Sequence, residues 1–135
     1  MNFFKSFLVL ASLVSMNSAF AADTAIPYQD APKFYNQTKT VEGTVISTFC
    51  NEKMCFLNFD KDYNKFLSAV IMSGDFAKFS KAGAKDIKAE MDKMYMGKKI
   101  QITGILNEYK GKDTTKPGRP QIAVTDATNI KVVTK

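Results

Sequence analysis

Apolar and polar residues alternate most clearly in the last third of the chain. Ile100 and Ile102 lie on either side of Gln101, and a second alternating run covers 120–126. Successive side chains of a strand point to opposite faces, so each run predicts a strand that buries one face. Gly104 continues the apolar side of the first run, and a missing side chain there lets a strand bend or bulge. Such bending favours a small closed barrel.

Three further strands are predicted upstream, at 40–49, 55–60 and 66–72. The first of them needs an irregularity. Val41 and Val45 are an even number of residues apart and would point to the same face of a regular strand, whereas Ile46 would point to the opposite face. Gly43 is the expected position of a bulge that reconciles them.

A helical pattern separates the third of these strands from the two at the end of the chain. Apolar residues recur at three- and four-residue steps between 84 and 95, and charged residues take most of the positions between them. This periodicity predicts an amphipathic helix. Gly97 is expected to end it as a C-terminal cap, and its Met-rich face is expected to close one end of the barrel.

Several short motifs carry a resemblance to a known family. Gly-Lys-x-Ile-x-Ile-x-Gly begins at Gly97, Tyr-x-Gly begins at Tyr109, and Pro-x-Ile-x-Val-x-Asp begins at Pro120. Together they resemble strands four and five of exported bacterial OB-fold domains grouped with nucleic-acid binders. The segments 41–45 and 55–60 resemble the first two strands of such domains. The resemblance implies a scaffold that binds single-stranded nucleic acid, oligosaccharide or protein.

Periodicity and resemblance therefore predict the same fold. It is an all-β fold with one helix, namely a five-stranded OB-fold Greek-key barrel with the helix between strands 3 and 4. Its length of 135 residues and 45% hydrophobic content fit one globular domain. The domain is expected at 40–133, after an extended N-terminal lead-in at 22–39.

Residues 1–21 have the features of a cleavable secretory signal peptide. Lys5 precedes an apolar run at 7–14, and Ala19 and Ala21 surround Phe20 near the expected cleavage site. No later run reaches the roughly 20 apolar residues of a transmembrane helix. We therefore expect a periplasmic or secreted protein without a transmembrane segment in the mature chain.

The chain is basic, and this narrows the chemistry of its partners. Its formal net charge is +6, which falls to +5 when Lys5 leaves with the signal. A positive charge favours anionic partners such as nucleic acid, lipid headgroups or acidic glycans, without choosing among them.

The two cysteines of the chain bracket a four-residue connection between two predicted strands. In an exported protein, Cys50 and Cys55 are expected to form a disulfide that closes this hairpin, with a stabilisation of about 2 kcal/mol. A redox couple is the alternative, although thioredoxin-like sites use Cys-x-x-Cys in a βαβ unit. A zinc site would need further ligands, and the chain contains no His.

The segment that starts at Asp60 resembles the opening of a calcium loop. That pattern continues with Gly at the sixth position and Glu at the twelfth, where this chain has Lys65 and Ile71. We interpret the segment as a polar turn, and we expect neither a metal nor a cofactor.

The residue content also argues against an enzyme. Without His, the chain lacks the commonest general base near neutral pH. Phosphodiester cleavage on an OB-type barrel needs carboxylates with a metal ion and arginines that clamp phosphate. Arg119 is the only arginine of the chain, so a nuclease is not expected.

The predicted binding site is the basic loop at 107–120, which lies where OB folds bind ligands. Cations can follow phosphates, and flat rings can stack on bases. The site comprises Lys53, Phe56, Tyr109, Lys110, Lys112, Lys116 and Arg119. Two other interpretations stay open, because lysines can simply keep a loop soluble and Phe56 can belong to the core.

Three functions follow as hypotheses. The first is a module that binds single-stranded nucleic acid. The second is a protein-interaction module of a cell-envelope assembly, which would use the aromatic residues of the lead-in and exposed strand faces. The third is a binder of anionic polysaccharide or of a lipid surface through the same lysines. The sequence predicts no oligomeric state.

Overall fold

The computed structural model describes residues 24–80 and 86–133. The predicted signal peptide at 1–21 lies outside the described residues. Within the described part of the chain, none of the helices is long and apolar enough to cross a membrane.

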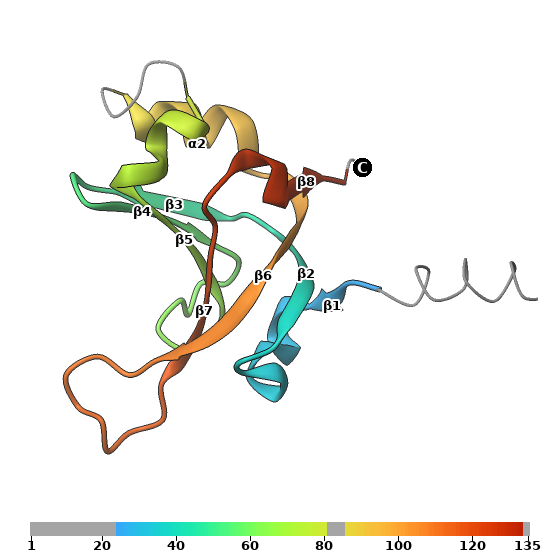
Figure 1. The fold of residues 1–135 in the computed structure, drawn as a ribbon, viewed down its shortest axis with the longest axis vertical. Helices are drawn as coiled ribbons and strands as arrows, with labels where there is room; N and C mark the ends of the chain where they lie inside the picture. The colour runs from blue at the N-terminus through green and yellow to red at the C-terminus, as the bar shows by residue number, and fades with distance from the viewer. Residues whose placement is uncertain (1–23, 81–85, 134–135) are drawn as a thin grey trace, which may run out of the picture.

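The described chain is mostly β structure with short helices (Figure 1). The strands are β1 (Ile26–Pro27), β2 (Thr38–Thr44), β3 (Ser47–Cys50), β4 (Met54–Asn58), β5 (Ser68–Met72), β6 (Lys99–Tyr109), β7 (Arg119–Ala123) and β8 (Ile130–Val132). The helices are α2 (Ile87–Tyr95) and three 3-10 segments, η1 (Tyr28–Phe34), η2 (Ser73–Lys78) and η3 (Ala127–Asn129).

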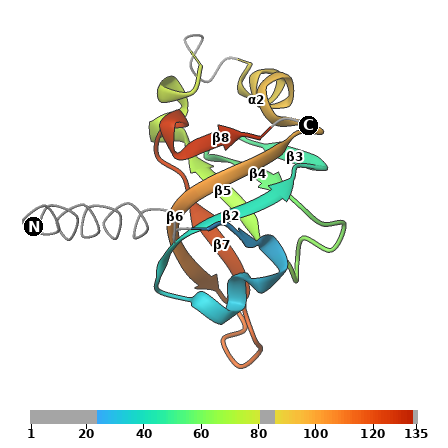
Figure 2. The same cartoon turned by 90° about the vertical axis from the view of Figure 1, so that its right-hand side faces the viewer.

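Hydrogen bonding links the strands in the order β1-β2-β6-β7-β5-β4-β3, and β8 pairs with β6 beside this path. The β5–β7 and β1–β2 pairs are parallel, and the other pairs are antiparallel. Figure 2 shows β6 as the long central strand, with β2 and β8 beside it. The prediction of five strands in a closed barrel is therefore corrected to an eight-stranded sheet whose two outer strands, β1 and β3, do not pair with each other within the described residues.

The first predicted strand, at 40–49, is in fact two strands. The Val45 N–H donates to the Lys98 carbonyl at 3.0 Å, whereas the Ile46 N–H donates to the Asn58 carbonyl at 2.9 Å. These two consecutive residues thus bond to different neighbouring segments. The switch of the inward-facing side that Val45 and Ile46 indicate in the sequence falls at this break between β2 and β3. The bulge expected at Gly43 is absent from β2, because Gly43 pairs regularly with Ile100.

The lead-in is not simply extended. It forms β1 and η1, and the Tyr28 ring stacks on the Phe59 ring with centroids 5.7 Å apart. A side chain at Gly43 would place its Cβ only 2.8 Å from the Phe59 ring, so a glycine is needed under this aromatic pair. Aromatic residues of the lead-in therefore pack on the sheet.

The core matches the alternation of the sequence. The inward-facing residues that are fully buried include Val41, Leu57, Ile71, Ile102 and Ile122, and β5 is buried at four consecutive positions. The predicted amphipathic helix is confirmed over Ile87–Tyr95, with Ile87, Met91 and Tyr95 buried and Gly97 following at φ +76°. It comes after the fifth strand of the chain rather than the third. The break after the strand at 66–72 predicts a short helical turn around Phe76, and η2 lies there, whereas η1 and η3 were not among the predicted elements.

Candidate functional site

The outward face of β3 and β4 carries aromatic side chains. Cys55 and Leu57 point into the core, so Phe56 between them points outward and is only half-buried. Phe49 is its register partner on β3 and is 52% exposed. The two rings stack with centroids 6.4 Å apart.

A disulfide fixes the hairpin next to these rings. Cys50 and Cys55 are register partners and are joined by a disulfide, as their spacing predicted. The Asn51 side chain accepts hydrogen bonds from the N–H groups of Lys53 and Met54, at 2.7 and 2.9 Å, which orders the turn. Phe49 directly precedes Cys50 in the sequence, and Phe56 directly follows Cys55, so the disulfide restrains the pair of rings.

Arg119, the first residue of β7, joins a third ring to this pair. Its guanidinium carbon lies 5.6 Å from the centroid of the Phe56 ring and 5.6 Å from that of the Tyr109 ring. Its Nη1 donates a hydrogen bond to the Tyr63 carbonyl at 2.6 Å, which holds the side chain in place. We call Phe49, Phe56, Tyr109 and Arg119 the aromatic platform.

Two depressions lie on this face. The large depression has a volume of about 500 Å³, and its walls include Ser47, Phe49, Asn58 and Tyr63. The small depression has a volume of about 180 Å³ and is lined by apolar residues such as Met54 and Met72, together with Tyr109. Phe56 and Arg119 line both, so the depressions form one surface that crosses the platform.

The structure brings together only some of the predicted site residues. Phe56, Tyr109 and Arg119 meet on the platform, and the half-burial of Phe56 shows that it is not simply a core residue. Lys53 lies in the hairpin turn just before β4, where its carbonyl accepts from the Ser73 N–H at 2.8 Å. Lys53 lines neither depression.

The loop between β6 and β7, which carries Lys110, Lys112 and Lys116, extends away from the rest of the sheet (Figure 1). Lys110 faces Glu108 at 3.9 Å, and Lys116 faces Asp113 at 3.8 Å. Hydrogen bonds from the Thr115 hydroxyl and N–H lower the pKa of Asp113, so this carboxylate stays charged. These two acids weaken the positive field of the loop.

Phe49 and Tyr63 were missed by the sequence prediction. The signal for Phe49 was available, because a disulfide between Cys50 and Cys55 implies that their outer neighbours, Phe49 and Phe56, are opposite each other in the hairpin. Tyr63 is 48% exposed and belongs to an irregular turn, where no periodicity indicates which way a side chain points.

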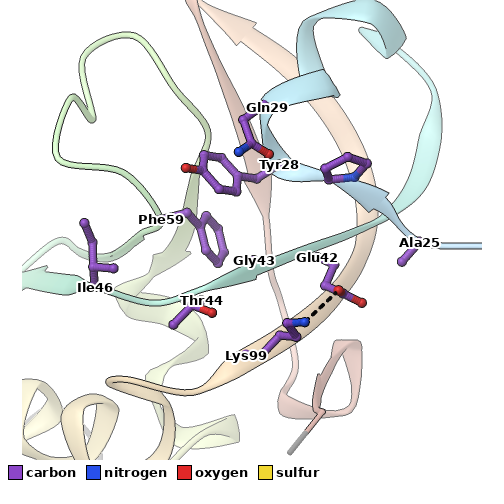
Figure 3. A pocket seen from close by; sticks show the side chains of 10 residues that line it. Ala25, Tyr28, Gln29, Glu42, Gly43, Thr44, Ile46, Phe59 and Lys99 are labelled. Atoms are coloured by element: carbon purple, nitrogen blue, oxygen red, sulfur yellow. Dashed lines mark ion pairs between the residues drawn. The ribbon is translucent and has the colours of Figure 1, made fainter. Parts of the chain in front are cut away.

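A separate pocket of about 420 Å³ lies between the lead-in and β2 (Figure 3). Three of its polar side chains are already engaged: the Tyr28 hydroxyl donates to Asp60 Oδ2 at 2.7 Å, and Lys99 faces Glu42 at 3.5 Å. Burial, together with the bond to Asp60, raises the pKa of Tyr28 to about 12. The hydrogen bond from Tyr28 to Asp60 and the stacking of Tyr28 on Phe59 hold the lead-in against the sheet.

The Asp60 carboxylate is occupied on both oxygens. Its Oδ2 accepts from the Tyr28 hydroxyl, and its Oδ1 accepts from the Asp62 N–H at 3.0 Å. The Tyr28 hydrogen bond is the main cause that lowers the pKa of Asp60. This arrangement is that of a polar turn. The part of the chain that the structure describes contains no group of three or more His, Cys, Asp or Glu residues placed to hold a metal ion.

The comparisons with known proteins bear on the fold. No protein-family model matches the sequence, and no curated protein does. Among solved structures, the chain is similar to part of an aspartyl-tRNA synthetase from Entamoeba histolytica, with a TM-score of 0.55 and 20% identity over 84% of this chain. It is also similar to part of an asparaginyl-tRNA synthetase from Pyrococcus horikoshii, with a TM-score of 0.53 and 15% identity over 83% of this chain. The architecture is OB-fold-like.

This likeness concerns the fold alone, because the identities are low. The matched part is 22% of the Entamoeba synthetase and 23% of the Pyrococcus synthetase, so the chain spans under a quarter of either protein. The OB-fold-like architecture confirms the fold prediction in its coarser form.

Proposed function

We propose that this chain is a non-enzymatic, exported binding module that holds single-stranded nucleic acid on the aromatic platform. The observation that carries the proposal is the position of Arg119, whose guanidinium lies at the same distance, 5.6 Å, from the Phe56 and Tyr109 rings. A cation thus sits between two flat rings on an open face, and Phe49 extends the row of rings.

Such a surface suits a flexible strand of bases. Every base has a flat face that can stack on an aromatic ring, and each stack contributes about 1–3 kcal/mol. Phe49 and Tyr109 are 52% and 51% exposed, so a base can reach either of them without any rearrangement of the core. Guanidinium groups stack on bases and pair with phosphates, so Arg119 can serve either contact.

The loop cations support the same ligand. Lys112 has no carboxylate partner within the described residues, and the pairs of Lys110 and Lys116 are exposed and long. Exposed ion pairs of this kind contribute little, so a phosphate can replace the carboxylate at small cost. The proposal of export rests on the sequence at 1–21 and on the disulfide, which is typical of oxidising compartments.

A protein partner is the second candidate, and one observation favours it. Phe49, Tyr63 and Met72 are all about half exposed on the face that holds the depressions. Apolar patches on a surface often mark contacts with other proteins. A cell-envelope protein could therefore occupy the same face.

Fluorescence anisotropy with labelled single strands of about 12 nucleotides, a length within the usual range for one OB domain, tests the proposal. Wild type is expected to bind saturably at low salt. Phe49→Ala and Tyr109→Ala are each expected to weaken binding by roughly 5- to 150-fold through lost stacking. Ile105→Ala is the matched control, because Ile105 is 53% exposed but lines neither depression.

The outcomes separate the candidates. Losses in both aromatic variants, with the control unchanged, support the nucleic-acid proposal. Absence of saturable binding at low salt overturns it and leaves the protein partner as the leading account. Equal binding of single strands and of a sulfated polysaccharide, both insensitive to the aromatic variants, would instead favour the anionic-polymer alternative.

A further inference from the structure

A chain of buried polar side chains ends in the large depression. Asn58 and Ser68 are only 5% and 0% exposed, although they lie on the outward side of their strands. Ser68 Oγ donates to Asn58 Oδ1 at 2.7 Å, and Asn58 Nδ2 donates to Ser47 Oγ at 3.1 Å. Ser47 is half-buried and lines the depression.

The hydrogen bonds along this row of side chains all run in one direction. Ser68 is fully buried, so its hydroxyl proton needs an acceptor inside the protein, and Asn58 Oδ1 provides it. The oxygen of the Asn58 amide therefore faces Ser68, and its NH₂ group faces Ser47. Ser47 Oγ accepts from that group, and within the described residues its own proton is donated to no other atom. The chain thus presents a hydroxyl donor to the depression.

The other fixed polar group of the depression is also a donor. The guanidinium of Arg119 has five N–H bonds and no acceptor, and among the described residues only its Nη1 has a hydrogen-bond partner, the Tyr63 carbonyl. The Thr48 hydroxyl does not compete, because it donates to Asp92 on the side of α2. No carboxylate is among the lining residues that the structure describes.

We propose that the large depression selects bases by the edge that faces away from the sugar, and that it prefers an edge with a carbonyl acceptor. Ser47 is the specificity-determining residue of this site. The inference rests on the proposed function. A base stacked on Phe49 or Phe56 turns its edge toward Ser47 and Arg119, both of which offer donors. Uracil and thymine carry the O4 acceptor in that position and can accept from both groups, whereas cytosine carries the N4 amino donor, which finds no acceptor on Arg119 and only the remaining lone pair of Ser47 Oγ.

The cleanest comparison is between oligo(dU) and oligo(dC) of about 12 nucleotides, since both have one-ring bases that differ only in the group at position 4 and the proton on the neighbouring N3. Wild type is expected to prefer oligo(dU) by about fivefold in anisotropy titrations at one salt concentration, the factor of a typical single hydrogen bond. Ser47→Ala should bring the ratio close to one. Ser47→Thr keeps the hydroxyl and should keep the preference, and Thr125→Ala removes an exposed hydroxyl elsewhere and should leave the ratio unchanged.

Each outcome has a distinct meaning. Loss of the preference in Ser47→Ala alone, with the thermal midpoint retained, supports the inference. Equal binding of the two oligonucleotides by wild type overturns the inference but leaves the proposed function intact. An equal fall for both oligonucleotides in Ser47→Ala also overturns it, since the hydroxyl would then contact the phosphate backbone. Absence of binding to either one overturns the proposed function and the inference with it.

Discussion

Replacement of Gly104 by valine is expected to destabilise the protein more than replacement of Gly111 by alanine in the basic loop. Gly104 lies where β6 passes from pairing with β2 to pairing with β7. A Cβ at this position would be 3.1 Å from Ile122 Cγ1 and 3.2 Å from the Ala123 carbonyl oxygen. Both contacts are tighter than a side chain normally tolerates.

The surroundings of Gly104 cannot easily move. Ile122 is fully buried, and β7 is held by its pairing with β5 and by the Val124 N–H, which donates to the Val70 carbonyl at 2.9 Å. Overpacking of a filled site costs about 1–3 kcal/mol or more. The better strand propensity of valine and the loss of glycine freedom in the unfolded chain return up to about 1 kcal/mol. We expect a net loss of about 2 kcal/mol.

Thermal unfolding followed by circular dichroism measures this loss. For a domain of this size, about 2 kcal/mol lowers the midpoint by roughly 8 °C. Gly111→Ala should lower it by no more than about 2 °C, because the strain of φ +68° is partly offset by reduced freedom of the unfolded chain. Gly74→Ala is the control, since a Cβ there meets nothing within 4 Å. Equal midpoints for Gly104→Val and Gly111→Ala would refute the packing argument.

Three further predictions concern single groups. Alkylation of the denatured protein without reductant should label neither Cys50 nor Cys55, and labelling of both would contradict the disulfide. The Tyr28 phenol should ionise near pH 12 rather than 10 in a titration of phenolate absorbance, and Asp60→Asn should lower that pKa; because the folded state holds this proton more tightly, its contribution to stability is complete below pH 10 and is lost as the pH rises to about 12. Glu108→Gln should strengthen oligonucleotide binding at low salt, since it frees a loop cation, and unchanged affinity would show that the pair already opens on binding.

The sequence predicts those parts of the fold in which a periodic pattern is long enough to detect. Ile100, Ile102 and Leu106 are all fully buried, as their spacing along β6 indicates. The strands β1 and β8 have only two and three residues, too few for a pattern, and they form because β2 and β6 offer free edges. Their presence depends on tertiary pairing rather than on local preference.

The candidate site shows a similar division. Tyr109 and Arg119 stand out in the sequence as an aromatic residue and a cation near the two ends of one loop, and register brings them together as a β6–β7 pair. Lys53 also stands out as a cation near Phe56 in the sequence, but its charge alone does not tell whether it lines the depressions, and it lines neither. The donor chain that ends at Ser47 depends on neighbours across β4, and no local pattern in the sequence reveals it.

The salt dependence of binding to a single strand tests the central claim most directly. Each cation that displaces a counterion from a single strand contributes about −0.7 to the slope of log affinity against log salt. Lys112 and Arg119 alone give about −1.4, and the release of Lys110 and Lys116 from their carboxylates brings the slope to about −3.

We predict saturable anisotropy titrations with a slope between about −1.4 and −3. Replacement of all four cations by alanine should remove most of this slope, whereas Tyr109→Ala should lower affinity and leave the slope almost unchanged. Absence of saturable binding at low salt, or a quadruple variant with the affinity and slope of wild type, would contradict the account.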